Sequence, residues 1–129
     1  MKPLFLTLDE VLALHADQIR RYGGFHGIRD LALLESAVAN ARATFEGSFL
    51  HPTIFEMAAA YLYGICRNHP FVDGNKRAAL ITAMAFLAMN DVVIRADDDD
   101  FYDLVIGVAE GTVSRSAVAV FLERSGHQP

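Results

Sequence analysis

NKRAALITAMAFLAMN, residues 75–90, is the stretch of this chain that decides its fold. Apolar residues occupy almost every side of the helix that it would form; they are Ala79, Leu80, Ile81, Met84, Phe86 and Leu87. A helix that is apolar all round is normally the buried centre of a bundle. Its apolar run, 78–89, is also shorter than the roughly 20 residues that span a bilayer. The stretch therefore predicts a domain built around one central buried helix.

Helical periodicity and capping residues predict five further helices around this one. Thr7 and Glu10 form a capping-box pattern at the start of the first, and Asp30 and Ser114 are suited to cap the second and the sixth. Their apolar stripes are Leu8, Val11, Leu12, His15 and Ile19 in the first; Leu31, Leu34, Val38 and Ala41 in the second; Ile54, Ala58, Tyr61, Leu62 and Ile65 in the third; Phe101, Leu104, Val105 and Val108 in the fifth; and Ala117, Val118, Phe121 and Leu122 in the sixth. His15 is expected to be a satisfied core residue.

Prolines and polar runs mark the connections between these helices. Pro52 suits the first turn of the third helix, and Pro70 ends that helix because the residue before a proline avoids the helical region. Residues 43–51 are expected to be a loop, residues 92–95 a short extended piece, and the acidic run 97–100 a solvated start to the fifth helix. The pattern as a whole predicts a compact all-α domain of about six helices.

Composition limits the class of protein. The 129 residues suit a single domain, 1–129, and 53% hydrophobic residues are enough for a core. The net charge of -5 disfavours a protein that coats nucleic acid, so no direct nucleic-acid binding is expected. Cys66 is the one cysteine, which excludes an intrachain disulfide and fits a reducing compartment. With no signal-peptide pattern and no membrane-spanning run, we expect a cytoplasmic protein.

The stretch HPFVDGNKR, residues 69–77, concentrates polar residues in the turn before the central helix. The start of a helix presents unpaired N–H groups and the positive end of its dipole, so it attracts anions. Gly74 leaves room for a phosphate near the backbone, and Lys76 and Arg77 add positive charge. This arrangement is typical of a phosphate-binding site.

Two more residues of the stretch can act on a bound phosphate. Asp73 is a hard oxygen ligand of the kind that Mg²⁺ takes beside phosphate oxygens. His69 is the natural general base, because imidazole titrates near neutral pH. Together these parts indicate phosphoryl or nucleotidyl transfer. The alternative is structural: Asp73 would only cap the central helix, and Lys76 and Arg77 would be solvated on its first turn.

These residues resemble the signature of the Fic/Doc family, H-x-F-x-[DEN]-[AG]-N-[GK]-R. Every constrained position is filled; the residues are His69, Phe71, Asp73, Gly74, Asn75, Lys76 and Arg77. A second segment, RYGGFHGIRDLALLESAVA at 21–39, resembles the family's GG…G-x-R-D…LLESA region. The resemblance covers essentially the whole chain and implies a small six-helix bundle of the Fic/Doc type.

Within the family, the chain is similar to the death-on-curing branch, the toxins of bacterial toxin–antitoxin pairs. The AMP-transferring branch usually has glycine in place of Lys76 and arginine in place of Leu80. The resemblance implies transfer of the γ-phosphoryl group of ATP to a threonine of translation elongation factor Tu, which arrests translation. Two alternatives stay open: AMP transfer to a protein hydroxyl on the same fold, and a catalytically silent module that only binds an antitoxin.

The resemblance also implies roles for individual residues. His69 would deprotonate the target threonine, and Asp73 would hold Mg²⁺. The phosphates of ATP would lie in a cradle formed by Gly74, Asn75, Lys76 and Arg77. The family positions its target chain by β-like pairing with a flap, for which residues 43–51, with Phe45 and Phe49, are the candidate.

Regulation is inferred from a motif that the chain lacks. Some family members inhibit themselves with an [ST]-x-x-x-E-[GN] helix, but Arg42 and Ile106 stand four residues before the two Glu-Gly pairs. The resemblance therefore implies inhibition by the C-terminal helical segment of a cognate antitoxin. No zinc site is expected, because the other histidines lack metal-ligand spacing; they are His15, His26, His51 and His127.

Overall fold

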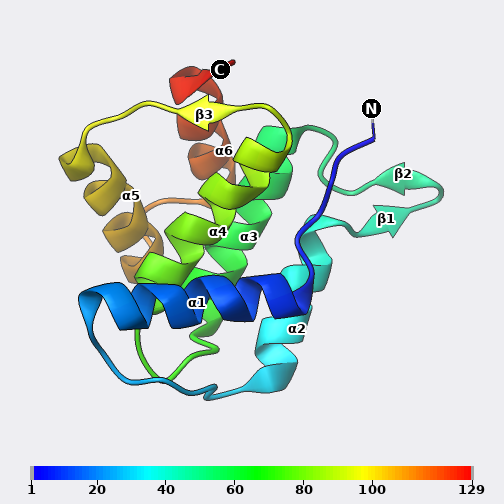
Figure 1. The fold of residues 1–129 in the computed structure, drawn as a ribbon. Helices are drawn as coiled ribbons and strands as arrows, with labels where there is room; N and C mark the ends of the chain where they lie inside the picture. Colours follow the sequence, from blue (N-terminus) through cyan, green and yellow to red (C-terminus); the bar gives the residue numbers. More distant parts are fainter. Residues whose placement is uncertain (1, 129) are drawn as a thin grey trace.

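The structure, a computed structural model, describes residues 2–128. Within them the chain forms six α-helices and four short strands, which confirms the all-α prediction (Figure 1). In chain order they are α1 (Leu8–Tyr22), α2 (Leu31–Ala41), β1 (Thr44–Phe45), β2 (Ser48–Phe49), α3 (Ile54–Asn68), α4 (Asn75–Met89), β3 (Val93–Ile94), α5 (Asp98–Glu110), α6 (Arg115–Ser125) and β4 (Gly126–His127).

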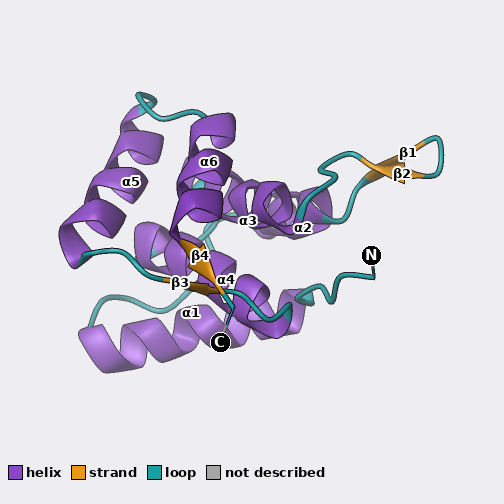
Figure 2. Cartoon of the chain, turned by 90° about the horizontal axis from the view of Figure 1, so that it is seen from above, coloured by secondary structure: helices purple, strands orange, loops and turns teal. Residues whose placement is uncertain are grey.

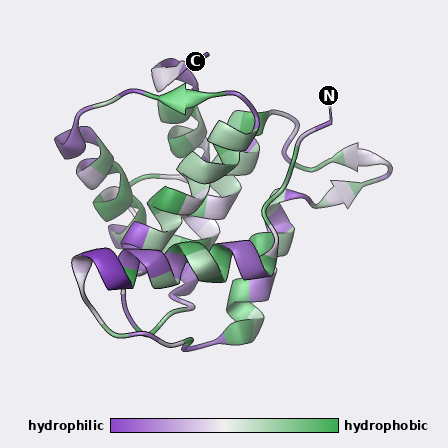
Figure 3. Ribbon diagram, in the orientation of Figure 1, coloured by the Kyte–Doolittle hydropathy of each residue, from purple (hydrophilic) through white to green (hydrophobic). Residues whose placement is uncertain are grey.

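The centre of the bundle is a pair of helices, α3 and α4, rather than α4 alone. The two have the most extensive contact of any elements; α2 and α6 pack against α3, α1 packs against α4, and α5 touches both. Figure 1 shows α1 crossing in front of the pair, and Figure 3 shows the hydrophobic residues concentrated along it. The prediction of a buried central helix is therefore confirmed for α4, and α3 shares that place because Tyr61, Leu62 and Ile65 are fully buried.

Two residues of the predicted apolar stripes are exposed. Leu31 is 46% exposed because it is the first residue of α2, whereas Leu34, one turn later, is fully buried. Ala117 is exposed because α6 packs against α3 through Val118 and Leu122, which stand one turn apart. Periodicity thus identified the helices, but it wrongly assigned one exposed residue, Leu31 or Ala117, to the apolar stripe of each of these two helices.

Capping residues set most of the helix starts. The predicted capping box of Thr7 and Glu10 is present, as are the predicted caps Asp30 and Ser114. The start of α3 differs from the prediction: Thr53 is the N-cap and forms a second capping box with Glu56, so Pro52 lies outside the helix. The T-x-x-E signal for this cap was present in the sequence.

The strands form two small antiparallel ribbons. Residues 43–51, expected to be a loop, contain the β1–β2 hairpin, which projects away from the helices (Figure 2). The extended piece expected at 92–95 is confirmed as β3, and it pairs with β4 near the end of the chain. None of the helices in residues 2–128 is long and apolar enough to cross a membrane.

Candidate active site

The turn between α3 and α4 begins at His69. This residue ends α3 with φ 47° and ψ 53°, in the left-handed region that non-glycine residues seldom adopt. The reversal leaves His69 exposed and turns Pro70 and Phe71 into the core. The predicted end of the third helix is therefore confirmed, and the candidate base stands at the surface at that end.

The connection between α1 and α2 holds this turn from outside. The N–H groups of Arg29 and Asp30 both donate to the carbonyl of Pro70, at 2.7 and 3.0 Å. Ile28 forms an isolated antiparallel bridge with Phe71. The turn is thus paired along its backbone with a segment about 40 residues earlier in the chain, which restricts its motion.

Arg29 also binds the end of α3 with its side chain. Its Nε donates to the carbonyl of His69 at 2.6 Å and its Nη2 to the carbonyl of Asn68 at 2.8 Å. A cation suits this position because the last carbonyls of a helix are unpaired and carry its negative dipole end. Arg29 thus stabilises the reversal that places His69, a role that its place in the sequence motif did not indicate.

Asn75, predicted to contact phosphate, uses its side chain to close the turn. Its Oδ1 accepts from the N–H of Phe71 at 2.9 Å, and its Nδ2 donates to the carbonyl of Phe71 at 3.0 Å. The same Nδ2 lies 3.4 Å from Nδ1 of His69. Since the side chain is buried and occupied, the backbone N–H at the start of α4 is what Asn75 can offer to an anion.

The start of α4 is open toward an anion. Gly74 is its N-cap, in a left-handed conformation with φ 75°, and no side chain accepts a hydrogen bond from the first turn. Lys76 is exposed and Arg77 half-buried beside these N–H groups. The structural alternative is therefore wrong in having Asp73 cap the helix, although Lys76 is exposed as that alternative also expected. The structure thus brings uncapped N–H groups together with Lys76 and Arg77 at one helix start, and their binding of phosphate stays a prediction.

Asp73 faces the α1–α2 connection. Its Oδ2 accepts from the N–H of Phe25 at 3.1 Å, and its Oδ1 accepts from the N–H of Gly74 at 2.8 Å. These hydrogen bonds, followed by the charge of Arg77, hold the pKa of Asp73 below its usual value. An ionised carboxylate has further lone pairs on both oxygens, so Asp73 fits the single protein carboxylate that Mg²⁺ takes beside phosphates.

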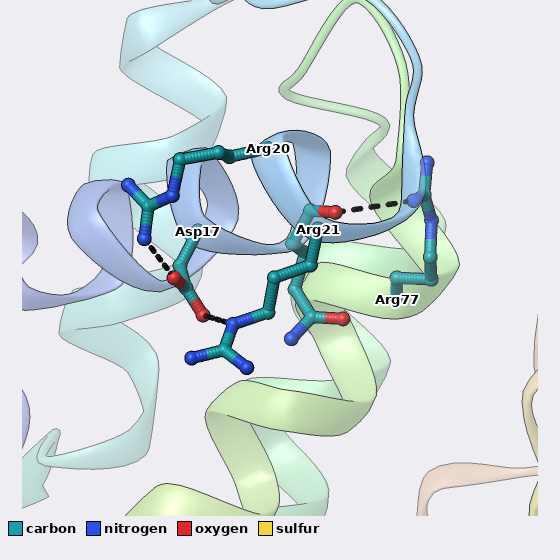
Figure 4. Close-up of polar contacts among 5 residues, drawn as sticks. Asp17, Arg20, Arg21 and Arg77 are labelled. Atoms are coloured by element: carbon teal, nitrogen blue, oxygen red, sulfur yellow. Dashed lines mark hydrogen bonds and ion pairs between the residues drawn. The ribbon is translucent and has the colours of Figure 1, made fainter.

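Arg77 is directed toward the end of α1. Its Nη2 donates to the carbonyl of Gly23 at 2.9 Å. Its Nη1 lies 3.4 Å from the carbonyl of Gln18, and this contact is the dashed line drawn from Arg77 in Figure 4. Figure 4 also shows Asp17 of α1 bound by both Arg20 and Arg21. Arg77 therefore ties α4 to α1, and its predicted contact with phosphate would use the N–H groups that these carbonyls leave free.

A pocket of about 470 Å³ opens at the start of α4. One wall consists of Leu80 and residues 73–77, so it brings together every predicted site residue except His69. The other wall belongs to α5 and consists of Asp98, Phe101, Tyr102 and Val105. A helix start with free N–H groups next to a wall with two aromatic residues is an arrangement compatible with a nucleotide.

Comparisons with known proteins agree with this geometry. A family model described as the Fic/DOC family matches residues 5–87, which include the whole turn and most of α4. The chain belongs to the Fic/Doc family. Two similar proteins have Doc in their names. The chain is 38% identical to "Protein kinase doc" of Escherichia phage P1 over 119 residues, which is 92% of this chain and 93% of the relative. It is 45% identical to "Toxin Doc" of Mycolicibacterium smegmatis over 92 residues, 71% and 70% of the two chains.

The family model does not cover the α5 wall of the pocket. The matched residues end at 87, and α5 begins at Asp98. The anion-binding wall is therefore the part that the family model describes, whereas the aromatic wall was missed at the sequence level. Phe101 was assigned to the apolar stripe of its helix, and the signal that the sequence offered was a second aromatic residue next to it, Tyr102, which the structure shows 63% exposed.

The predicted Fic/Doc flap does not lie beside the turn. The β1–β2 hairpin within 43–51 precedes the N-terminus of α3, whereas His69 follows its C-terminus. A 15-residue helix is about 22 Å long, so the two stand at opposite ends of α3, as Figure 1 shows. The segment that flanks the turn is instead 23–30 of the α1–α2 connection, where Phe25 is 75% exposed and Ile28 41% exposed.

Proposed function

We propose that this chain is the toxin of a toxin–antitoxin pair and transfers the γ-phosphoryl group of ATP to a threonine hydroxyl of a translation factor, with elongation factor Tu as the target. The observation that carries the proposal is the start of α4, where uncapped N–H groups and two cations adjoin Asp73, and where Asn75 lies 3.4 Å from Nδ1 of His69. The names of the two relatives, a protein kinase and a toxin, support the same assignment.

His69 would take the proton of the attacking hydroxyl at Nε2, which has no hydrogen-bond partner within residues 2–128. To accept a proton there, the neutral ring must carry its own proton on Nδ1. Nδ1 lies 3.4 Å from Nδ2 of Asn75, which is itself a donor, so this tautomer requires that Nδ2 donate to the carbonyl of Phe71 and not to His69. A well-placed base accelerates such a reaction by about 10²–10⁴-fold.

The phosphates would lie against the first turn of α4. The free backbone N–H groups from Asn75 onward and the ammonium of Lys76 would bind their oxygens, and Arg77 would add charge from the side of α1. Asp73 would hold Mg²⁺, which supplies charge neutralisation to the transferred group when bound. The reaction then depends on positioning and electrostatics more than on covalent chemistry by the protein.

The choice of phosphate over AMP rests on two residues. Lys76 stands where AMP-transferring relatives have glycine, and Leu80, where they have a second arginine, is part of the pocket wall and brings no charge. The pocket therefore has one strong anion-binding end, and Phe101 and Tyr102 offer an apolar surface to a nucleobase. This arrangement favours a nucleotide whose terminal phosphate points toward His69.

The target chain would dock on residues 23–28. Phe25 and Ile28 are exposed there, and Val72 across the turn is 56% exposed. An extended chain on this edge would reach the surface position of His69 with its hydroxyl. The cognate antitoxin, through its C-terminal helical segment, would inhibit the enzyme in trans. With these two partners, the activity would take place in the cytoplasm.

The test is incubation of the purified protein with Mg²⁺, elongation factor Tu, and ATP labelled at either the α or the γ phosphate. We expect label on the target from γ-labelled ATP alone, and mass spectrometry should find one added phosphate on a threonine. Label from α-labelled ATP would overturn the kinase assignment in favour of AMP transfer. Absence of label from both, with an antitoxin still bound tightly, would support the catalytically silent module.

A further inference from the structure

His15 is a buried histidine that the proposed chemistry does not use. It lies on the inner face of α1, is 3% exposed, and touches the turn at two points. Its ring stacks on the ring of Phe71, with centroids 3.7 Å apart and planes within 3° of each other. Its Nε2 lies 2.7 Å from the carbonyl oxygen of Asp73.

This contact defines the direction of the hydrogen bond. A carbonyl oxygen can only accept, so Nε2 of His15 carries a proton and donates it to Asp73. The ring also limits the space beside Gly74, because a Cβ on that residue would stand 3.6 Å from Nε2 of His15. One imidazole therefore contacts two of the four consecutive residues that lead into α4, Phe71 and Asp73.

The position of Asp73 depends on this support. The carboxylate of Asp73 is held by two N–H groups, from Phe25 and Gly74, neither of which lies within a helix. The hydrogen bond from His15 is the one that fixes the backbone of Asp73 to a helix. Without it, the carboxylate and the first-turn N–H groups would lose their common orientation.

We propose that His15 is a positioning residue that anchors Phe71 and Asp73 to α1, so that the Asp73 carboxylate and the first turn of α4 face the same phosphate. This proposal rests on the proposed function, because that function is what identifies Asp73 and the start of α4 as a phosphate site. The competing interpretation is a histidine that only fills the core, in which case its loss would lower global stability and leave the local geometry of the turn unchanged.

Two substitutions distinguish the stacking of the His15 ring on Phe71 from the hydrogen bond that His15 donates to Asp73. His15→Phe keeps the stack on Phe71 and removes the N–H, whereas His15→Gln keeps a donor at a similar reach and removes the stack. The matched control is His51→Phe, because His51 is also a buried histidine, 4% exposed, whose Nε2 lies 2.9 Å from Oδ1 of Asn40, away from the turn.

The first readout is amide hydrogen exchange of Phe25 and Gly74, which report directly on the Asp73 carboxylate. We expect these amides to exchange about tenfold faster in His15→Phe, because that variant loses one hydrogen bond. In His15→Gln and His51→Phe they should exchange near the wild-type rate. Unchanged exchange in His15→Phe, or an equal change in His51→Phe, would overturn the proposal. Should His15→Phe fail to fold, His15→Leu removes the donor in a second way.

The second readout is activity, which keeps this proposal separate from the proposed function. In the transfer assay, His15→Phe should need about tenfold more Mg²⁺ for half-maximal rate, with His15→Gln restoring most of the difference. If the wild-type protein transfers nothing, the proposed function fails while the exchange measurement still decides the role of His15. A lower maximal rate at unchanged Mg²⁺ dependence would contradict the positioning role.

Discussion

The two central helices begin in opposite ways. Both α3 and α4 have 15 residues, and they pack against each other. α3 starts with a complete capping box, in which Thr53 accepts from the N–H of Glu56 and Glu56 accepts from the N–H of Thr53. α4 starts at Gly74 with no side-chain cap, and its first turn carries Lys76 and Arg77 but no acid.

The difference shows that α4 does not begin in the way that best stabilises a helix. A missing cap costs about 1 kcal/mol, and cations in a first turn oppose the dipole by about 0.3–1 kcal/mol each. The start of α5 also lacks a side-chain cap, but three aspartates in its first turn complement the dipole. α4 alone among these three helices combines free N–H groups with positive charge, and a bound phosphate would satisfy both.

The largest effect should come from the residue where the two helices meet. His69→Asn removes the base, and asparagine tolerates the left-handed conformation at this position. We expect transfer to the target to fall by about 10²–10⁴-fold, and toxicity on expression to be lost. His127→Asn, an exposed histidine on β4, is the control and should transfer normally. Full toxicity of His69→Asn would exclude His69 as the base.

The next effect tests whether the charge at the start of α4 serves an anion. Lys76→Glu gives α4 the acidic first turn that α3 has, so the free energy of unfolding should rise by about 0.3–1 kcal/mol. ATP binding should weaken at least about tenfold, because a like charge then faces the phosphates. Calorimetric titration and thermal unfolding measure the two. Arg95→Glu, an exposed cation after β3, is the charge-matched control; equal loss of binding there would refute the assignment.

The opposite substitution tests the start of α3. Thr53→Ala removes the cap and should lower the free energy of unfolding by about 1 kcal/mol, with ATP affinity unchanged. Thr44→Ala in the exposed hairpin should alter neither quantity by more than about 0.5 kcal/mol. A change in ATP affinity with Thr53→Ala would mean that the two helix starts are not functionally separate.

The smallest effect concerns the pH dependence of stability. The pKa of Asp73 is lowered in the folded protein, so its contribution is complete above the ordinary value of 3.8 and is lost as the pH falls below that value. The difference in unfolding free energy between wild type and Asp73→Asn should therefore shrink on acidification from pH 6 to about pH 3. Asp100→Asn, an exposed aspartate on α5, is the control. A difference that grows on acidification would contradict the assigned hydrogen bonds.

Local patterns predicted the local parts of the structure well. Thr7 and Asp30 were identified as caps because a cap interacts three residues along the same helix. The cap at Thr53 was missed because Pro52 was taken as the signal for the helix start, although the T-x-x-E pattern of Thr53 and Glu56 was also present. The misplaced flap had a different cause, because no local signal says which end of α3 a hairpin or a connection will approach.

The sequence by itself determined that a six-helix domain forms around residues 75–90, that the chain has the Fic/Doc signature, and that Asp73, Lys76 and Arg77 gather at the start of a helix. Helix periodicity and helix dipoles are properties of neighbouring residues, so they can be read along the chain. The tertiary structure decided what supports that start: Arg29 on the end of α3, His15 beneath Asp73, and the α5 wall of the pocket. These contacts join residues about 25 to 60 positions apart, and packing, rather than any local preference, brings them together.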